Sequence, residues 1–291
     1  MLIFVLSENC HVDEPLNAYF CRTMKTILKY VVVLMTIISC NNEDHDKKSA
    51  GPGTQQVADH EKVLQDSVLK FPDSLLLKEQ LIQYYRDNDN YEKAINTTDE
   101  FLRKDSLNAR LWDIKATLYF ENDDTANAIR SLETAVQLIH EPGYLMKLGA
   151  LYAKSKNKKA LDIADILLQG DFSNVKTEAF YIKGLYHTYT GDKNKAIGFF
   201  ERSLLNDYNY MPAYLEKAIA FYDQGKFNDA LKVLDKAVTL QNKFDEGYYW
   251  KGRCLEKLNK KDEAVEQYQL ALLYSPDYTE AKDALTRLGV K

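Results

Sequence analysis

Proline and glycine are scarce in this chain of 291 residues, which contains 6 and 12 copies of them. Because these residues break helices and form tight turns, their scarcity disfavours a many-stranded sheet and favours long helices. An excess of positive charge is lacking too, since the formal net charge is −5 and Lys and Arg are interspersed with Asp and Glu. The basic stripe of a nucleic-acid-binding protein is therefore missing, and we expect no nucleic-acid partner.

Groups of side chains that could perform chemistry are also lacking. No two of the five histidines, and no histidine and cysteine, stand at the spacing of metal ligands. The sequence has no glycine-rich phosphate loop and no Ser or Cys nucleophile motif. We therefore predict that the protein is not an enzyme and that it has no catalytic site, metal or cofactor. His187 falls at a core aromatic position of the repeat described below, and we expect it only to pack.

An apolar run over residues 27–38 is too short to cross a bilayer but suits the apolar core of a secretory signal peptide. Two lysines accompany its start, and it ends in Ile-Ile-Ser-Cys at residues 37–40. This ending resembles the lipobox of bacterial lipoproteins, in which the peptide is cut before the cysteine and the cysteine is lipidated. The resemblance implies a signal peptide over 24–39 and a lipidated Cys40, whose acyl chains (such as palmitate) would hold the protein at a membrane. The alternative is a short buried helix with a chance cysteine.

The same interpretation places the initiator at Met24, so we expect residues 1–23 to be a mis-annotated extension. Residues 40–56 contain almost nothing apolar and cannot bury enough surface to offset chain entropy, so we expect a flexible tether. The acidic stretch over 41–44 resembles the surface-export signal of Bacteroidetes lipoproteins, although an ordinary solvated tether has a similar composition. We expect a cell-envelope protein that contacts the outer membrane through its lipid anchor only, on the periplasmic face or at the cell surface.

A period of 34 residues runs through the C-terminal half of the chain. Glycine or alanine recurs at one position, alanine at a second, alanine or serine at a third and a bulky residue at a fourth. These positions are Gly184, Ala218 and Gly252; Ala196, Ala230 and Ala264; Ser203, Ala237 and Ala271; and Phe200, Leu234 and Tyr268. The small residues let two antiparallel helices approach closely, and the bulky residues fill the grooves between them.

This pattern resembles the tetratricopeptide repeat, a helical hairpin whose copies stack on one another. The resemblance implies an all-α fold over residues 57–291, a right-handed superhelix (α-solenoid) of about six helical hairpins plus capping helices. We expect an amphipathic helix over 57–71 before the hairpins and a polar-faced capping helix over 279–289 after them. The repeats should start near residues 75, 109, 142, 177, 211 and 245.

In the tetratricopeptide fold, the first helix of each hairpin lines a concave groove, mainly through in-repeat positions 2, 5, 9 and 12. These positions are mostly apolar or aromatic in the third to fifth repeats. Exposed apolar patches tend to mark partner sites, and tyrosines are good interface anchors. The resemblance thus implies a partner-binding groove, for which we select Phe120, Met146, Tyr181, Leu185, Leu215, Ile219, Tyr222, Tyr249 and Arg253. Neighbouring repeats or the N-terminal helix could cover these residues instead.

Such a groove on an envelope protein fits a scaffold or assembly factor that binds other envelope proteins or peptides. The alternative is a glycan- or substrate-binding lipoprotein of a nutrient-uptake system, although the long insertions that build such sugar sites are missing. A self-associating structural protein is a third possibility, and the sequence leaves the oligomeric state open.

A short motif of Asp, then Ser or Thr, then an apolar residue occurs four times. It resembles the O-glycosylation sites of exported Bacteroidetes proteins. The hydroxyl residues concerned are Ser67, Ser74, Ser106 and Thr125. Three of the motifs lie at expected helix boundaries, where these residue types also act as caps, so capping is the alternative.

Overall fold

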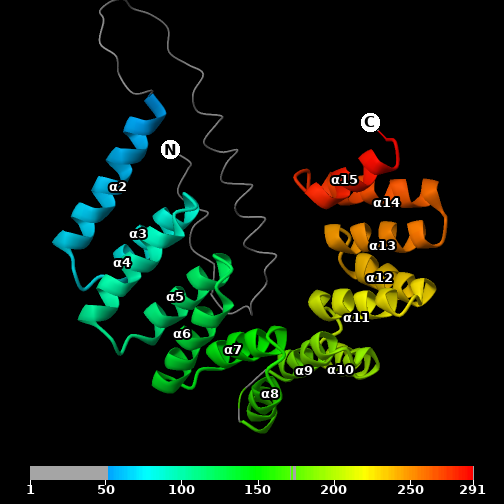
Figure 1. The fold of residues 1–291 in the computed structure, drawn as a ribbon, viewed down its shortest axis with the longest axis horizontal. Helices are drawn as coiled ribbons and strands as arrows, with labels where there is room; N and C mark the ends of the chain where they lie inside the picture. Colours follow the sequence, from blue (N-terminus) through cyan, green and yellow to red (C-terminus); the bar gives the residue numbers. More distant parts are fainter. Residues whose placement is uncertain (1–51, 171, 173–174, 291) are drawn as a thin grey trace, which may run out of the picture. The chain divides into compact units, whose positions relative to one another are not determined.

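The computed structural model describes residues 52–170, 172 and 175–290. Over this part of the chain it contains fourteen α-helices, α2 to α15, and no β-strand (Figure 1), which confirms the expected all-α fold. None of these helices is both long enough and apolar enough to cross a membrane. The lipidation site expected at Cys40, the signal peptide over 24–39, the extension 1–23 and the tether up to residue 51 lie outside the described residues.

Two compact units divide the helices, and the boundary between them falls at Tyr144 and Leu145 inside α7. The helices of the N-terminal unit are α2 (Pro52–Lys70), α3 (Leu75–Asp87), α4 (Tyr91–Lys104), α5 (Ala109–Glu121), α6 (Thr125–Leu138) and the start of α7 (Pro142–Lys154). α2 begins five residues before the expected residue 57, within the expected tether. The physical reason is that proline has its φ angle fixed near the helical value and suits a first turn, so the helix can start at Pro52.

The C-terminal unit contains the rest of α7 and the eight helices that follow. They are α8 (Lys159–Gln169), α9 (Lys176–Thr190), α10 (Lys193–Asn206), α11 (Met211–Asp223), α12 (Phe227–Leu240), α13 (Asp245–Lys257), α14 (Lys261–Tyr274) and α15 (Thr279–Arg287). Six helical hairpins result, whose first helices (α3, α5, α7, α9, α11 and α13) begin within one residue of the expected repeat starts. α2 packs against α3 and α15 packs against α14, so each end of the series carries an additional helix (Figure 1).

A single residue with a positive φ angle follows the first helix of every hairpin. These residues are Asp89, Asp123, Lys156, Gly191, Gly225 and Asn259, with φ between 55° and 91°. Gly, Asn and Asp adopt this left-handed conformation more readily than other residues, which explains most of these identities. In three hairpins the next residue, Asn90, Asp124 or Asp192, accepts a hydrogen bond of 3.0–3.1 Å from a backbone N–H in the second helix. The expected solvated cap at Asp124 is one of these, and the turns fix the angle at which the second helix starts.

Alanine occupies the closest contact between the two helices of each hairpin. Six alanines, one in each second helix, have no exposed surface: Ala94, Ala128, Ala160, Ala196, Ala230 and Ala264. A larger side chain at these positions would push the paired helices apart. Within each unit, helices pack mainly against the helices next to them in the chain, as in other repeat proteins.

Candidate functional site

In-repeat positions 2, 5, 9 and 12 of the first helices are called the first-helix face below, and all nine residues selected from the sequence belong to it. Phe120 lies in the N-terminal unit, and the other eight lie in the C-terminal unit. None of the nine is fully exposed. Leu185 and Leu215 are buried, at 4% and 8% exposure, and the other seven are half-buried. The hairpins themselves therefore cover these two leucines, and a partner would meet mainly the aromatic and charged members.

Arg253 on α13 lies among three aromatic rings. Its guanidinium carbon is 4.4 Å from the centre of the Trp250 ring, 5.0 Å from that of Tyr222 and 5.9 Å from that of Tyr249. Its Nη2 atom donates a long hydrogen bond of 3.5 Å to the Tyr222 hydroxyl. The faces of aromatic rings attract cations, so these four side chains, called the Arg253 cluster, join α11 to α13.

Sequence reasoning selected three members of the Arg253 cluster and missed Trp250. Trp250 lies at in-repeat position 6, outside the positions assigned to the groove, yet its ring meets that of Tyr222 edge to face with the ring centres 5.4 Å apart. The signal that could have found it is its size, because it is one of only two tryptophans in the chain.

Two tyrosines of the first-helix face in the C-terminal unit each contact a tyrosine from a connection between helices. The Tyr181 and Tyr210 ring centres are 5.3 Å apart at an interplanar angle of 80°, and those of Tyr249 and Tyr278 are 5.0 Å apart at 40°. Burial raises the pKa of both Tyr210 and Tyr278. These two were missed in the sequence because they lie in the connections before α11 and α15, although their spacing of 68 residues equals two repeats.

Glu216 on α11 is an acid in a poorly solvated position. Burial raises its pKa to about 7, while the positive charge of Lys154 acts in the opposite direction and the negative charge of Asp223 adds to the rise. Trp250 occupies the same in-repeat position one repeat later, so a carboxyl group here replaces a large aromatic residue. Its protonation state changes near neutral pH, which makes it a pH-sensitive element beside the first-helix face.

An ion pair lies at the C-terminal end of the first-helix face. Arg287 on α15 donates hydrogen bonds of 2.5 Å and 2.9 Å to the two carboxylate oxygens of Glu256 on α13. The buried Tyr268 donates a further hydrogen bond to Glu256. The hydrogen bond from Arg287 is the main cause of the lowered pKa of Glu256, and this bidentate pair ties the last helix to the sixth hairpin.

Ion pairs between neighbouring hairpins occupy the first-helix face of the N-terminal unit. Arg86 on α3 pairs with Glu121 on α5, and Arg110 Nε on α5 donates to Glu79 Oε1 on α3 at 3.0 Å. Arg110 also lies 3.7 Å from the carboxylate of the buried Asp113. This face therefore satisfies its charges internally, whereas the face of the C-terminal unit is mainly apolar, with three tyrosines.

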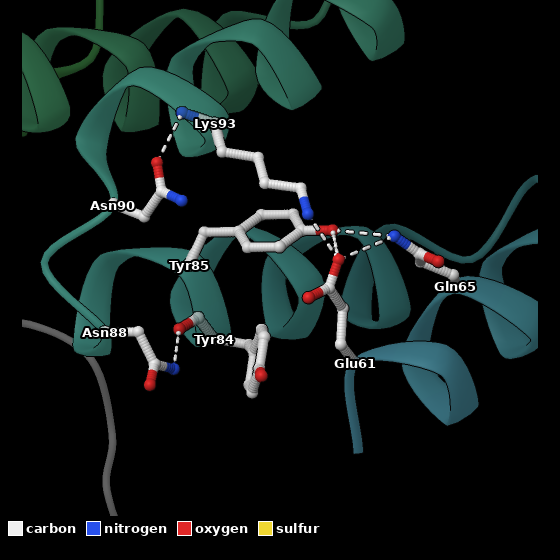
Figure 2. A network of polar contacts seen from close by, with 7 residues as sticks. All are labelled: Glu61, Gln65, Tyr84, Tyr85, Asn88, Asn90 and Lys93. Carbon is white, nitrogen blue, oxygen red and sulfur yellow. Dashed lines mark hydrogen bonds and ion pairs between the residues drawn. The ribbon is translucent and has the colours of Figure 1, made fainter. Parts of the chain in front are cut away.

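A polar network fastens α2 to the first hairpin (Figure 2). The Glu61 carboxylate on α2 accepts hydrogen bonds from Lys93 Nζ, from the Tyr85 hydroxyl at 3.1 Å and from Gln65 Nε2 at 3.0 Å. Figure 2 shows these donors converging on one oxygen of Glu61, and the Lys93 ammonium also lies 4.6 Å from the centre of the Tyr85 ring. The hydrogen bond from Lys93 is the main cause of the lowered pKa of Glu61, so α2 is held by charge as well as by apolar packing.

The four expected O-glycosylation residues lie at different kinds of position. Ser67 is inside α2 and donates to the Val63 carbonyl at 2.7 Å, while Ser74 caps α3 by accepting from the Leu77 N–H at 3.4 Å. Ser106 is exposed in the connection before α5, and Thr125 is the half-buried first residue of α6. Ser106 is thus the most accessible of the four hydroxyls.

His187 and Cys254 both serve packing. His187 stacks on Phe199 with ring centres 5.4 Å apart, and burial lowers its pKa. Cys254 has no exposed surface, and burial raises the pKa of its thiol to about 12, which makes it a poor nucleophile. Within the described residues, no group of three or more His, Cys, Asp or Glu side chains is arranged to hold a metal ion.

Comparison with known proteins was made for both the sequence and the fold. A family model described as tetratricopeptide repeat matches residues 80–139 and 215–278. No curated protein matches the sequence. A tetratricopeptide repeat protein from Parabacteroides merdae superposes with a TM-score of 0.65, at 18% identity, over 81% of this chain and 94% of that chain.

Two further solved structures have a similar fold. PilW, described as a widely conserved type IV pilus biogenesis factor, superposes with a TM-score of 0.57, at 19% identity, over 72% of this chain and 97% of that chain. A chain of the Cut9–Hcn1 hetero-tetramer of the APC/C superposes with a TM-score of 0.52, at 16% identity, over 81% of this chain and 46% of that chain. The tetratricopeptide repeat model thus matches parts of both units, and the six hairpins share the all-α fold of these solved structures.

Proposed function

We propose that the protein is a non-catalytic scaffold of the bacterial cell envelope that binds a segment of another protein along the first-helix face of its C-terminal unit. The observation that carries this proposal is the Arg253 cluster. It gathers three aromatic rings and a guanidinium from two neighbouring helices on one half-buried surface. Aromatic and arginine side chains contribute most of the binding energy at protein interfaces, because they bury large rigid surfaces and still form polar contacts.

The side chains on the first-helix face differ between the two units, and this difference favours the C-terminal unit as the binding unit. Arg86 and Arg110 in the N-terminal unit already pair with carboxylates of the neighbouring hairpin. A partner that displaced these pairs would have to replace the interactions it broke, so it would gain little net binding energy. Half-buried aromatic side chains lose no such partner when they are covered, and their burial is favourable.

Two of the similar structures are consistent with a role in holding other proteins. PilW is described as a factor in pilus biogenesis, and Cut9 was solved in a complex with Hcn1. The fold hosts many tasks, so this likeness supports a scaffold as a class of function. The partner itself is to be found by experiment.

Site-specific photocrosslinking in living cells tests the binding face. A photoreactive amino acid replaces Tyr222 on the proposed face, and in a matched control it replaces Leu205, which is 85% exposed on α10. We expect discrete crosslinked products from position 222 and none of these from position 205. Identical products from both positions, or none from 222, would contradict the proposed face.

The anchor expected at Cys40 is a separate part of the proposal, and it has its own test. Cells expressing the protein are labelled with an alkyne analogue of palmitate and then fractionated. We expect label on the protein and recovery in the outer-membrane fraction, with both lost in Cys40→Ser. Label that persists in Cys40→Ser would remove the lipid anchor from the proposal and leave the binding face untouched. Protease treatment of intact cells then distinguishes the cell surface from the periplasmic face.

A further inference from the structure

One set of three residues, two on the first-helix face and one in a connection beside it, recurs at an interval of two repeats. The set is Glu178, Tyr181 and Tyr210, and it recurs as Glu246, Tyr249 and Tyr278, while the repeat between has Pro212, Leu215 and Phe244. In both copies the tyrosine rings are in contact, and in both the carboxylate adds to the effect of burial in raising the pKa of the second tyrosine. The two copies are therefore alike in sequence, in ring contact and in the effect of the carboxylate, although the rings meet at 80° in one copy and at 40° in the other.

The two copies differ in the cation that accompanies them. In the sixth repeat the chain supplies its own cation, since Arg253 lies 5.9 Å from the centre of the Tyr249 ring. In the fourth repeat Leu185 occupies the position of Arg253. Among the residues that the structure describes, no Lys or Arg forms an ion pair with Glu178. Leu185 thus brings no charge to the first copy, and Glu178 has no ion-pair partner in the described part of the chain.

Glu178 is consequently an acid whose environment is unfavourable for its charge. Its Oε2 atom is buried and accepts no hydrogen bond from any described residue. Burial raises the pKa of Glu178, and the negative charge of Asp207 raises it further, although the Glu178 backbone N–H partly offsets this. A positively charged hydrogen-bond donor would satisfy the buried oxygen and offset the repulsion from Asp207.

We propose that Glu178, Tyr181 and Tyr210 form a receptor for a lysine or arginine side chain of the partner segment. The ammonium or guanidinium donates to the Glu178 carboxylate and lies against the tyrosine rings. Carboxylates and aromatic rings both attract cations, and together they favour a cation over a neutral donor. This proposal rests on the proposed function, because it supplies the chemistry of the segment that binds the same face.

A protein segment fits this site better than a free amine because the face continues beyond it. α9 packs against α11 and α11 against α13. Packed helix axes lie roughly 8–10 Å apart, so α13 is roughly 16–20 Å from α9. An extended chain rises about 3.3 Å per residue and covers that span with about five or six residues. A segment with its basic residue at Glu178 therefore reaches the Arg253 cluster about five or six residues further on.

The test selects displayed random dodecapeptides on the purified full-length protein in detergent and measures their affinity by fluorescence anisotropy. We expect the selected peptides to share a Lys or Arg, and Glu178→Gln to weaken them at least about tenfold. The matched control is Glu266→Gln, which neutralises an exposed acid on α14 and should leave the affinity unchanged. A second variant exchanges the charges of the protein and the peptide. Glu178→Lys should bind peptides in which the basic residue is replaced by Glu. Circular dichroism melting confirms that each variant is folded.

The outcomes separate this inference from the proposed function. Peptides that bind wild type and Glu178→Gln equally but lose affinity with Tyr222→Ala overturn the cation receptor and keep the binding face. Failure to select any peptide overturns both. Putrescine is measured by itself as a small amine. If it binds wild type as tightly as the peptides do, and Glu178→Gln abolishes its binding, the ligand of this site is a small amine and not a protein segment. Light scattering measures the oligomeric state. If wild type is a dimer and Glu178→Gln is a monomer, the partner is a second copy of this chain and not another protein.

Discussion

Gly184 on α9 lies directly against the ring of Phe200 on α10. A methyl group added to Gly184 would come within 2.3 Å of Phe200 Cε1, and one added to Gly252 would come within 2.6 Å of Tyr268 Cε1. In the repeat between them, Ala218 lies in the same core cluster as the smaller Leu234. The fourth to sixth hairpins thus match the size of a small residue to the side chain opposite, glycine to a ring and alanine to leucine.

Gly184→Ala should destabilise the C-terminal unit by about 1–3 kcal/mol, because the added methyl group overpacks a buried contact. Gly198→Ala is the control, since it places a methyl group on α10 with nothing within 4 Å. That change should stabilise the protein by about 0.5–1 kcal/mol through the higher helix propensity of alanine. Urea unfolding followed by circular dichroism measures both.

The same contact predicts a rescue. Phe200→Leu combined with Gly184→Ala reproduces the pair Ala218 and Leu234, so the double variant should be more stable than the sum of the two single changes implies. A double-mutant cycle measures this coupling. Strict additivity would mean that Gly184 and Phe200 do not constrain each other.

Glu216 should make the stability fall as the pH rises. Its pKa is about 7 in the folded state and ordinarily 4.5, so between these values the folded chain keeps a proton that the unfolded chain has released. The free energy of unfolding therefore decreases between about pH 4.5 and pH 7, by at most about 3 kcal/mol. Glu216→Gln removes this term, so it should be more stable than wild type at about pH 8 and lose that advantage near pH 4.5. Urea unfolding at both pH values checks this, and Glu266→Gln should show no such pH-dependent gain.

Glu61 and Lys93 should be coupled at neutral pH and uncoupled in acid. The pKa of Glu61 is lowered, so its contribution is present above its ordinary pKa and is lost as the pH falls through the lower folded value. Both side chains are partly exposed, at 27% and 44%, so we expect a coupling of only about 0.5–1 kcal/mol. A double-mutant cycle with Glu61→Gln and Lys93→Met at pH 7 and about pH 3 measures it. An equal coupling at both pH values would show that charge is not its source.

Arg253→Gln should alter the fluorescence of Trp250 and destabilise the protein by about 1 kcal/mol, because the cation leaves three aromatic rings. Only two tryptophans are present, so Trp112→Phe provides a background in which Trp250 is the single reporter. Arg253→Lys keeps the charge but not the planar group, and we expect it to recover part of the loss. If Arg253→Gln leaves both the emission and the stability unchanged, the guanidinium contributes nothing to these rings.

The fold was predictable because its determinants are local and repeat. The spacing of Ala196, Ala230 and Ala264 indicates where two helices touch, and all three are fully buried. The helix caps follow the same logic, since Asp124 and Asp192 both accept from the start of a second helix. These features depend on one hairpin at a time, so the sequence of that hairpin is enough to place them.

The candidate site was only partly predictable because burial there depends on the adjacent hairpin. Leu215 occupies a groove position, but Phe244 from the next connection shares its core cluster and helps to cover it. Trp250, Tyr210 and Glu216 lie outside the positions used to read the groove, and the structure brings them to its side. The residue pattern of one helix does not predict which side chains from a neighbouring connection will pack onto that helix.

α15, which packs against the sixth hairpin, is buried on one side and charged on the other. A series of like hairpins has no inherent end, because each one offers its successor an apolar surface similar to the one it has just covered. On α15, Ala284 and Leu285 belong to the core cluster around Tyr268 and Ala281 is also buried, while Lys282 and Asp283 are exposed. The bond between Arg287 and Glu256 holds this one-sided helix in place. α15 thus acts as a terminator of growth: it accepts the surface of the sixth hairpin and presents charge, instead of a further stacking surface, to any second array that approaches.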